Sequence, residues 1–521
     1  MQLAAPSLYY LNHFHRALAW LAQTPTPVIS RHDQRFIDEF LSLPLAAQAL
    51  WVRLTLRQPA HFRRSKLDYS EIESIDGAIA DLINCQWISV SHPLTGYELY
   101  SLLSKAECDQ QFGHQPLKRD HLPKFSKLPD QPFRQACTID DQIITHLSRD
   151  QADRLRLAFF GNLHQDWSEF VLQDLGVRHF LAGSDTPASG FVSAQEFEAC
   201  WQLEQIKIEQ LEDSLAHLQR LLKIPACGPT VARRQAKALF QIARQFERQQ
   251  AHGLAKLIYQ HLVHAQSRIR LIRVLESLDP VQAYRLARQV QGFPQTTAEQ
   301  AAVRPALNRL RRVLGLPHQP ASRYLPTERE INVAQGHDSI EQRSAQALRR
   351  PGCEVWHTEN RLFRLLWRLH YWPVLNAPVD GAFFNPFQHE PADLSAPDFR
   401  EKRAHCWPKQ IDYAQWMTRF LDWPEGTRAG FTRQQLDQIL TCIPRNHLQA
   451  IFDRIWQDPK AHLLGFPDLI QLDPVQGQYA LIEVKGPGDA LQVHQRQWLE
   501  YFDQQGIPAW VCHAKPIAHA I

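Results

Sequence analysis

The stretch "GFPDLIQLDPVQGQYALIEVKGPGD", residues 465–489, decides how the C-terminal part of the chain folds. Two runs rich in alternating apolar residues, "FPDLIQL" and "YALIEVK", flank the turn sequence "DPVQGQ" and predict a β-hairpin. Side chains two apart in a strand share a face, so Glu483 and Lys485 point the same way. The pairing brings Asp468, at the start of the first strand, near Glu483. We therefore expect two carboxylates and one amine to meet at an edge of the sheet.

The charged residues of this hairpin are of the kinds used in metal-dependent phosphodiester hydrolysis. Carboxylate oxygens are preferred ligands of Mg²⁺, so Asp468 and Glu483 are predicted metal ligands, together with the carbonyl oxygen of Val484. Lys485 is placed to orient the attacking water or to stabilise charge on the phosphoryl group. A salt bridge between Glu483 and Lys485 would explain "EVK" taken alone. The Pro-Asp pair upstream, and the helix predicted by "DALQVHQRQWLEYFDQQG" downstream, favour the hydrolytic site.

Length and composition indicate a multidomain protein without covalent cross-links. The 521 residues predict about three or four domains of ~100–200 residues. Nine cysteines occur without a CxxC pair, which excludes a zinc ribbon or a disulfide framework. The net charge of +3 excludes a general polycation, so nucleic-acid binding requires local basic clusters. No window resembles a signal peptide or a membrane span, and we expect a cytoplasmic protein that uses no membrane and no small-molecule organic cofactor.

Residues 1–100 are expected to form an N-terminal DNA-binding domain. Apolar residues at helical spacing are followed by the basic segment "QPAHFRRSKLDY" and by "GAIADLINCQWISV", which predicts a helix leading into a strand. This order favours a winged-helix-like fold. A solvated positive surface without a ligand is an equally good explanation of the charges. The predicted phosphate contacts are Arg57, Arg63, Arg64 and Lys66.

Three further regions follow along the chain. Residues 101–190 contain "HQPLKRDHLPKFSKLPDQPF", whose prolines and charges predict a loosely folded basic connector. Residues 191–320 repeat the i, i+3, i+4, i+7 apolar pattern and predict a TPR-like array of paired helices. Residues 337–521 are mixed α/β and contain the opening hairpin. The fold class is therefore multidomain, α together with α/β.

The motifs resemble those of a known nuclease family. "GFPDL", "EVKGPGD" and "QRQWL" resemble the VRR-NUC branch of the PD-(D/E)xK nucleases. "SLYYLNHFHRAL", "FFGNLHQDWSEFVLQDLGV" and "HTENRLFRLLWRLHYWPVL" resemble successive blocks of the Fanconi-associated nuclease family, in the same order. The resemblance implies an N-terminal DNA-binding region, a SAP-like region, a TPR-like region and a C-terminal nuclease domain. It also implies a Mg²⁺- or Mn²⁺-dependent nuclease that cuts branched double-stranded DNA near a 5′ flap, degrades 5′ ends and acts in interstrand crosslink repair.

The resemblance also implies roles for residues whose spacing in the sequence indicates none. Glu359, in "HTEN", matches a metal-binding glutamate supplied by a helix ahead of the sheet, with Glu341 as the alternative. His357 is expected to be structural, or to contact the metal ligands without binding the metal itself. Three more residues match family positions: Gln495 as the glutamine on the helix after the ExK motif, Lys460 as a contact to a 5′ phosphate, and His494 as a phosphate contact where relatives carry lysine.

Two other functions are compatible with parts of the sequence. One is a nuclease for Holliday junctions, other branched nucleic acids or RNA. The hairpin motif indicates the hydrolytic chemistry but does not determine which substrate structure is bound. The other is a non-catalytic adaptor that binds branched DNA and keeps a degenerate nuclease fold. The adaptor hypothesis predicts a missing ligand, whereas Asp468, Glu483 and Lys485 are all present.

Overall fold

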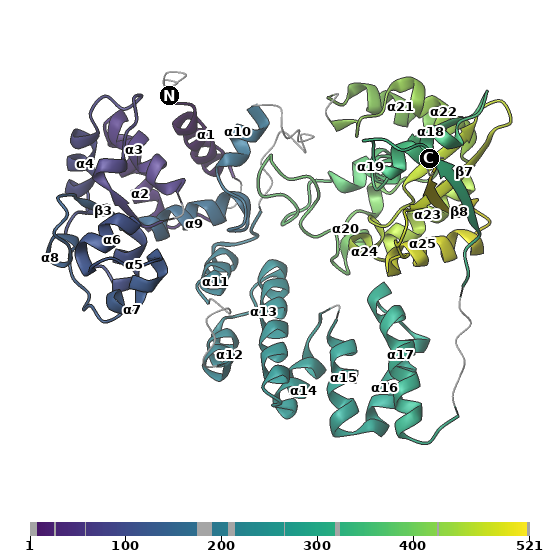
Figure 1. The fold of residues 1–521 in the computed structure, drawn as a ribbon, viewed down its shortest axis with the longest axis horizontal. Helices are drawn as coiled ribbons and strands as arrows, with labels where there is room; N and C mark the ends of the chain where they lie inside the picture. The colour runs from purple at the N-terminus through teal and green to yellow at the C-terminus, as the bar shows by residue number, and fades with distance from the viewer. Residues whose placement is uncertain are drawn as a thin grey trace. The chain divides into compact units, whose positions relative to one another are not determined.

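The computed structural model divides into two compact units, which we describe separately (Figure 1). The N-terminal unit contains residues 1–178, 185–204 and 383–387, and the C-terminal unit contains the remainder. The structure describes residues 8–24, 28–57, 59–174, 190–206, 214–264, 266–317, 324–424 and 427–517.

The N-terminal unit combines helices with a small antiparallel sheet. Its three strands are β1 (His61–Arg63), β2 (Ile88–Ser89) and β3 (Ile143–His146), in the order β1-β3-β2. Buried aromatic rings from three segments, represented by Phe14, Phe36 and Trp87, pack around Trp51, which is fully buried. The helices are α1 (Tyr9–Gln23), α2 (Arg31–Ser42), α3 (Leu45–Thr55), α4 (Ile75–Asn84), α5 (Gly96–Leu102), α6 (Lys105–Phe112), α7 (Leu122–Phe125), α8 (Phe133–Ala136), α9 (Arg149–Phe160), α10 (Ser168–Asp174) and α11 (Ala194–Glu204).

The expectation of a loosely folded connector after residue 100 is wrong. Strand β3 lies between β1 and β2, so the sheet of the first domain is completed by residues beyond its predicted end. Helices α5 to α8 enclose a core that includes Leu99, Cys108, Phe125 and Phe133. The prolines misled the prediction because Pro123 and Pro132 begin short helices, where a missing N–H costs nothing.

The first part of the C-terminal unit is a row of helices, which confirms the predicted helical array. Each of the helices α13 to α17 packs on the next along the chain (Figure 1). The packing faces carry apolar residues three or four positions apart, for example Phe240, Ala243 and Phe246. The helices are α12 (Ser214–Lys223), α13 (Pro229–Arg248), α14 (His252–His261), α15 (Ser267–Leu278), α16 (Pro280–Gly292) and α17 (Thr297–Val313).

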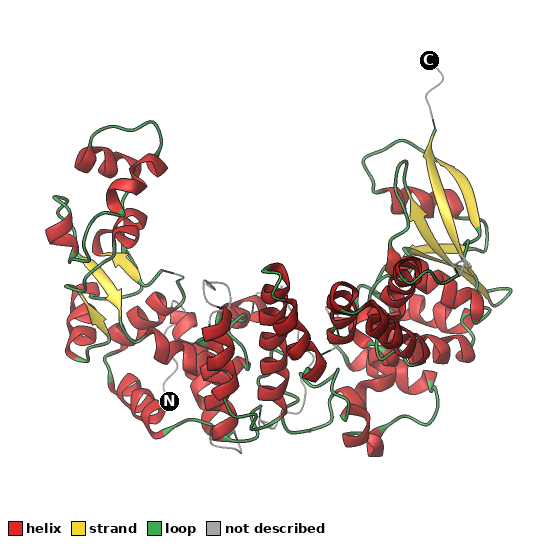
Figure 2. Ribbon diagram, turned by 90° about the horizontal axis from the view of Figure 1, so that it is seen from below, coloured by secondary structure: helices red, strands yellow, loops and turns green. Residues whose placement is uncertain are grey.

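The second part of the C-terminal unit is built on a five-stranded mixed sheet (Figure 2). Its order is β4-β8-β7-β6-β5; the pairs of β8 are parallel and the pairs of β6 are antiparallel. The predicted hairpin is confirmed as β6–β7, with Leu469 opposite Ile482. The strands are β4 (Glu328–Val333), β5 (Glu354–His357), β6 (Leu469–Asp473), β7 (Gln478–Lys485) and β8 (Ala509–Pro516).

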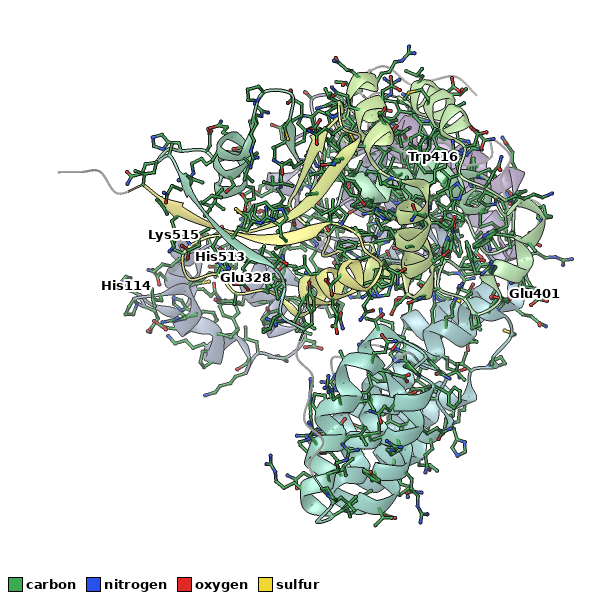
Figure 3. All side chains as sticks on the ribbon, turned by 90° about the vertical axis from the view of Figure 1, so that its right-hand side faces the viewer. His114, Glu328, Glu401, Trp416, His513 and Lys515 are labelled. Atoms are coloured by element: carbon green, nitrogen blue, oxygen red, sulfur yellow. The ribbon has the colours of Figure 1, made fainter. Side chains whose placement is uncertain are left out.

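Two expectations about this sheet need correction. Its first strand, β4, precedes residue 337, the predicted start of the nuclease domain. Strand β7 is the middle strand and not an edge, because the chain returns through a helix and adds β8 parallel to β7 on its open side. Figure 3 shows His513 on β8 beside Glu328 on β4, and their Nε2 and Oε2 atoms are 3.0 Å apart.

Helices and two apolar cores enclose the sheet. Leu481 belongs to one core, whereas Ile482 and Val484 belong to the other, so β7 is covered on both faces. The charged residues at the end of β7 are consequently buried. No described helix is both long enough and apolar enough to span a membrane. The helices are α18 (Ile340–Leu348), α19 (Leu362–Leu375), α20 (Phe399–Lys402), α21 (Tyr413–Asp422), α22 (Arg433–Cys442), α23 (Arg445–Gln457), α24 (Pro459–His462) and α25 (Val493–Gln504).

Candidate active site

Asp468 is fixed at the junction of three segments. It precedes β6, and its Oδ2 accepts a hydrogen bond of 2.7 Å from the Val484 backbone N–H on β7. Its backbone carbonyl accepts hydrogen bonds from the N–H groups of Thr358, at 2.8 Å, and Glu359, at 3.2 Å. The hairpin and the turn after β5 are thereby held together at the carboxylate.

Glu359 lies in the turn between β5 and α19, so the expectation that a helix supplies it is wrong. The physical reason is Asn360, whose left-handed φ of 52° ends the preceding strand and delays the helix until Leu362. Asn360 Oδ1 accepts a 2.8 Å hydrogen bond from the Gly465 N–H, while its Nδ2 donates to Glu359 Oε1 at 3.1 Å. The "HTEN" and "GFPD" motifs are therefore joined through one side chain.

Glu483 and Lys485 share a face of β7, as predicted, and they form an ion pair. Lys485 Nζ lies 2.9 Å from Glu483 Oε1 and donates a 3.1 Å hydrogen bond to Gln495 Oε1 on α25. The salt bridge that would explain "EVK" taken alone is therefore present within the site, because a carboxylate with 1% exposure requires a nearby cation. Gln495 Oε1 also accepts from the Gln492 N–H at 3.0 Å and so caps α25.

The site favours binding of a cation. Burial, followed by repulsion from Asp468, raises the pKa of Glu483 despite the neighbouring Lys485 ammonium. Burial also raises the pKa of Asp468, and Glu359 adds to the effect. Apart from the ion pair of Oε1 with Lys485, neither carboxylate oxygen of Glu483 accepts a hydrogen bond from any residue that the structure describes. Crowded, buried acidic oxygens with unfilled acceptor capacity fit a hard divalent ion.

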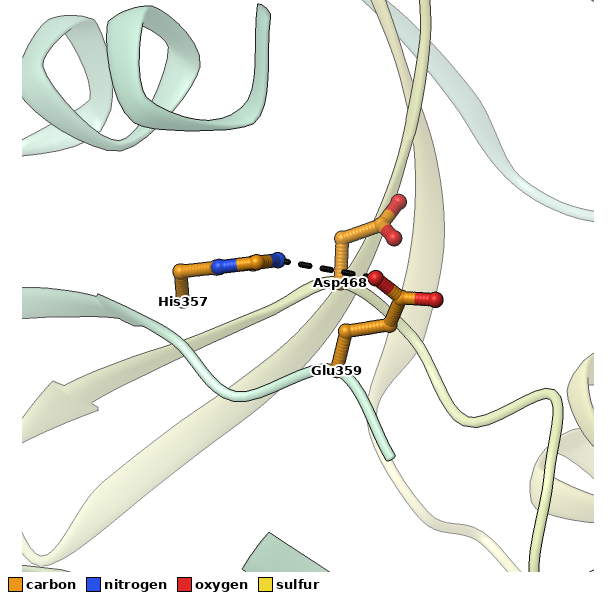
Figure 4. Close-up of side chains that lie close together, drawn as sticks. All are labelled: His357, Glu359 and Asp468. Atoms are coloured by element: carbon orange, nitrogen blue, oxygen red, sulfur yellow. Dashed lines mark ion pairs between the residues drawn. The ribbon is translucent and has the colours of Figure 1, made fainter. Parts of the chain in front are cut away.

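His357 comes closer to the carboxylates than the sequence indicated. Figure 4 shows its ring directed at Glu359, with 3.7 Å between Nε2 and Oε2. Ligand atoms of His357, Glu359 and Asp468 all lie within 4.8 Å of one another. The His357 side chain is 38% exposed, but its Nε2 atom is covered and has no hydrogen-bond partner among the described residues. The spacing His-x-Glu at the end of a strand is the signal that could have identified it.

The remaining candidate ligands are the Val484 carbonyl oxygen, on β7, and the Glu341 carboxylate, on α18. Val484 presents its N–H to Asp468. Since the N–H and C=O of a strand residue point to the same side, its carbonyl oxygen also faces Asp468. Glu341, the alternative to Glu359, lies in the first turn of α18, where its charge contributes to the raised pKa of Asp468.

The predicted DNA-contacting residues of the N-terminal unit are unequally available. Arg63 donates to Glu107 at 2.6 Å and to Asp141 at 2.7 Å, and its side chain is only 12% exposed. Arg64 donates to the exposed Asp76 at 2.7 Å. Both Lys66 and Arg57 are exposed. The basic segment is therefore partly a set of internal ion pairs.

Lys460 and His494 belong to the C-terminal unit. Lys460 is exposed on α24, and His494 is exposed in the first turn of α25. The His494 ring covers Gly465, where a Cβ would lie 2.3 Å from His494 Cδ2. Only a glycine, here with φ 83°, fits beneath this ring.

Sequence reasoning missed the charge of the helical array. Residues 214–317 contain seventeen Lys and Arg residues but only four Asp and Glu residues. Net charge over the whole chain conceals this excess, since the remainder of the chain is acidic. A count within each predicted domain would have identified the array as a second basic surface for phosphates.

Comparisons with known proteins cover both ends of the chain. The family model described as "FAN1, HTH domain" matches residues 8–89, and the model "VRR-NUC domain" matches residues 407–516. A "Fanconi-associated nuclease 1 homolog" from Pseudomonas aeruginosa is 34% identical over 97% of this chain and 96% of that protein. A protein of the same name from Arabidopsis thaliana is 22% identical over 99% of this chain and 68% of that protein.

A solved structure is similar over nearly the full length. It is described as a crystal structure of paFAN1 bound to 2nt 5′ flap DNA with a gap, and it matches with a TM-score of 0.86 and 33% sequence identity. The match covers 99% of this chain and 100% of that chain. The likeness thus includes the N-terminal unit, the helical array and the sheet with its carboxylates.

Proposed function

This chain belongs to the Fanconi-associated nuclease family and is a structure-selective DNA nuclease, and we propose that it cuts branched double-stranded DNA carrying a 5′ flap. The observation that carries this proposal is the buried Glu483 carboxylate beside Asp468, whose oxygens have no partner among the described residues other than the Lys485 ammonium. The flap DNA bound to the similar paFAN1 supports the choice of substrate. Removal of nucleotides from 5′ ends, crosslink repair and a cytoplasmic location at the DNA are proposed from family membership.

We assign the divalent cation, Mg²⁺ or Mn²⁺, to Glu359, Asp468, Glu483 and the Val484 carbonyl oxygen. Support comes from the oxygen-rich donor set and from the raised pKa of both buried carboxyls. His357 Nε2 lies on the same side as Glu359 and suits Mn²⁺ better than Mg²⁺, because imidazole prefers transition metals. When bound, the cation polarises the scissile phosphate and makes hydroxide accessible near neutral pH.

Lys485 and Gln495 are assigned to the reacting phosphate. Gln495 holds the Lys485 ammonium at 3.1 Å, beside the carboxylates. From this position Lys485 donates a hydrogen bond to a phosphoryl oxygen and offsets the negative charge that develops during attack. Gln495 keeps that ammonium oriented and, through its cap of α25, keeps the helix next to the hairpin.

DNA binding is assigned to basic residues outside the carboxylate cluster. Because residues 1–100 and 101–190 share one sheet, we treat them as a single DNA-binding region. In it Arg57 and Lys66 are the main phosphate contacts and Arg64 a weaker one. Arg63 anchors β1, next to Arg64 and Lys66 in the chain, through Glu107 and Asp141. Lys460, His494 and the array of residues 191–320 are assigned to phosphates nearer the nuclease domain of residues 337–521.

Cleavage of a 5′-flap oligonucleotide tests the function. With Mn²⁺, wild-type protein should cut the flap strand, and EDTA should stop it. Asp468→Asn should slow cleavage on the order of 10³-fold, yet retain DNA affinity. The matched control is Asp473→Asn, on the same hairpin but at the turn, where the carboxylate accepts from the Gln476 N–H. Equal cleavage by wild type and Asp468→Asn would refute the assigned chemistry.

A further inference from the structure

A cavity lined by arginines adjoins the carboxylate cluster. It has a volume of about 310 Å³ and begins at Asn360, the residue after Glu359. Arg361, Arg364 and Arg368 line it, at spacings of three and four residues that place them on one face along α19. The cavity therefore extends from the site along about 10 Å of helix.

The cavity carries more positive charge than its carboxylate can neutralise. Arg364 donates to Glu390 Oε1 at 2.6 Å. Among the described residues, Arg361 donates only to backbone carbonyls, those of His357 at 2.6 Å and Ala429 at 3.3 Å. Three guanidinium groups thus face one carboxylate in the part of the chain that the structure describes.

Arg368 is the least compensated of the three. It donates to the His389 carbonyl at 3.3 Å, and no described carboxylate forms an ion pair with it. Burial lowers the pKa of its guanidinium to about 10. Keeping a partly buried cation without a counter-ion costs free energy, and an anion in the cavity would recover that cost.

We infer that this arginine cavity binds a phosphodiester group of the DNA strand that leads away from the carboxylate cluster. Planar guanidiniums match phosphate oxygens in paired hydrogen bonds. Arg361 also ties the cavity to the site, because it holds the carbonyl of His357. The inference rests on the proposed function, since it takes the nuclease substrate as the source of the phosphate.

Binding assays without divalent metal test the cavity independently of cleavage. Anisotropy of a labelled 5′-flap DNA in EDTA is measured against salt for the full-length protein. Arg364→Gln and Arg368→Gln should weaken binding several-fold and lower the slope of log K against log salt by about 0.7–0.9 each. Arg433→Gln, an exposed arginine at the start of α22 that lies outside the cavity lining, is the control of equal charge change. Binding by the two cavity variants equal to that of Arg433→Gln would overturn the inference.

A variant expected to tighten DNA binding separates the effect of cavity charge from loss of binding through misfolding. Glu390→Gln releases Arg364 from its only described carboxylate, so it should tighten DNA binding and steepen the salt slope. A purely structural ion pair predicts unchanged or weaker binding, which would contradict the inference.

A ³¹P NMR titration with inorganic phosphate distinguishes free phosphate from the DNA strand as the source of the bound phosphate group. Saturation at low millimolar phosphate that disappears in Arg368→Gln would make free phosphate the ligand and overturn assignment to the strand.

Discussion

The basic segment around Arg63 and the acidic cluster around Glu483 look alike in sequence, because both are short charged runs in or next to strands. Folding gives them opposite electrostatic surroundings. Arg63 meets Glu107 and Asp141, so its charge is compensated within the protein. Glu483 instead meets a second carboxylate, Asp468, and has a single lysine for both. Folding thus neutralises Arg63 but concentrates like charge around Glu483. The comparison teaches that a charged run is functional where the fold leaves its charge uncompensated.

The largest expected difference between the two regions concerns stability. Arg63→Met should lower the free energy of unfolding of the N-terminal unit by about 3–5 kcal/mol, because it strands Asp141, whose side chain is only 3% exposed. Urea unfolding measures the change. Arg64→Met is the control, since its partner Asp76 is exposed and the pair is solvated; equal destabilisation by both substitutions would show that Arg63 is not the structural cation.

The next effect concerns catalysis in the acidic cluster. Lys485→Met should lower the single-turnover rate of flap cleavage by about 10²–10³-fold, because the phosphoryl group loses its cation. DNA affinity in EDTA should stay near the wild-type value. If affinity fell as much as the rate, Lys485 would be a binding residue and not a participant in the chemistry.

A smaller effect of opposite sign is expected for Glu483→Gln without divalent metal. The substitution removes a buried charge and its repulsion with Asp468, so the C-terminal unit should gain about 1–3 kcal/mol in free energy of unfolding. Thermal and urea unfolding in EDTA measure it, with Asp473→Asn as the control on the same hairpin. A loss of stability would mean that Lys485 compensates Glu483 fully, as Asp141 compensates Arg63.

The smallest effect is the pH dependence of that gain. The pKa of Glu483 is raised to about 7 in the folded protein, so the folded state holds a proton that the unfolded state has released. Stability of wild type from this group is therefore lost as pH rises from about 4.5 through 7. The advantage of Glu483→Gln should be full at pH 8 and nearly vanish at about pH 4, below the pKa of the unfolded carboxyl. A constant advantage across this range would assign it to packing.

The hairpin and the helical array could be predicted because their signals are local. Alternating residues fixed β6 and β7, and apolar spacing fixed the helices. The central position of β7 could not be predicted, since β4 and β8 reach the sheet from more than a hundred residues apart. The fold of residues 101–150 was hidden by prolines that begin helices there.

The site shows the same division between local and distant signals. The sharing of a face by Glu483 and Lys485 follows from strand geometry alone. The partners of Arg63 lie 44 and 78 residues away, so its neutralisation was invisible in the sequence. The approach of His357 to Asp468 depends on the backbone bonds that join two motifs over a hundred residues apart.

Binding of Mn²⁺ to the full-length protein in the absence of DNA tests the central claim, that the fold leaves a cation site at Glu483. Isothermal titration or the EPR signal of free Mn²⁺ should reveal binding to wild type and to Asp473→Asn. Glu483→Gln, expected to fold at least as stably as wild type, should weaken it by at least about tenfold because a charged ligand is lost. Unchanged affinity in Glu483→Gln would contradict the account.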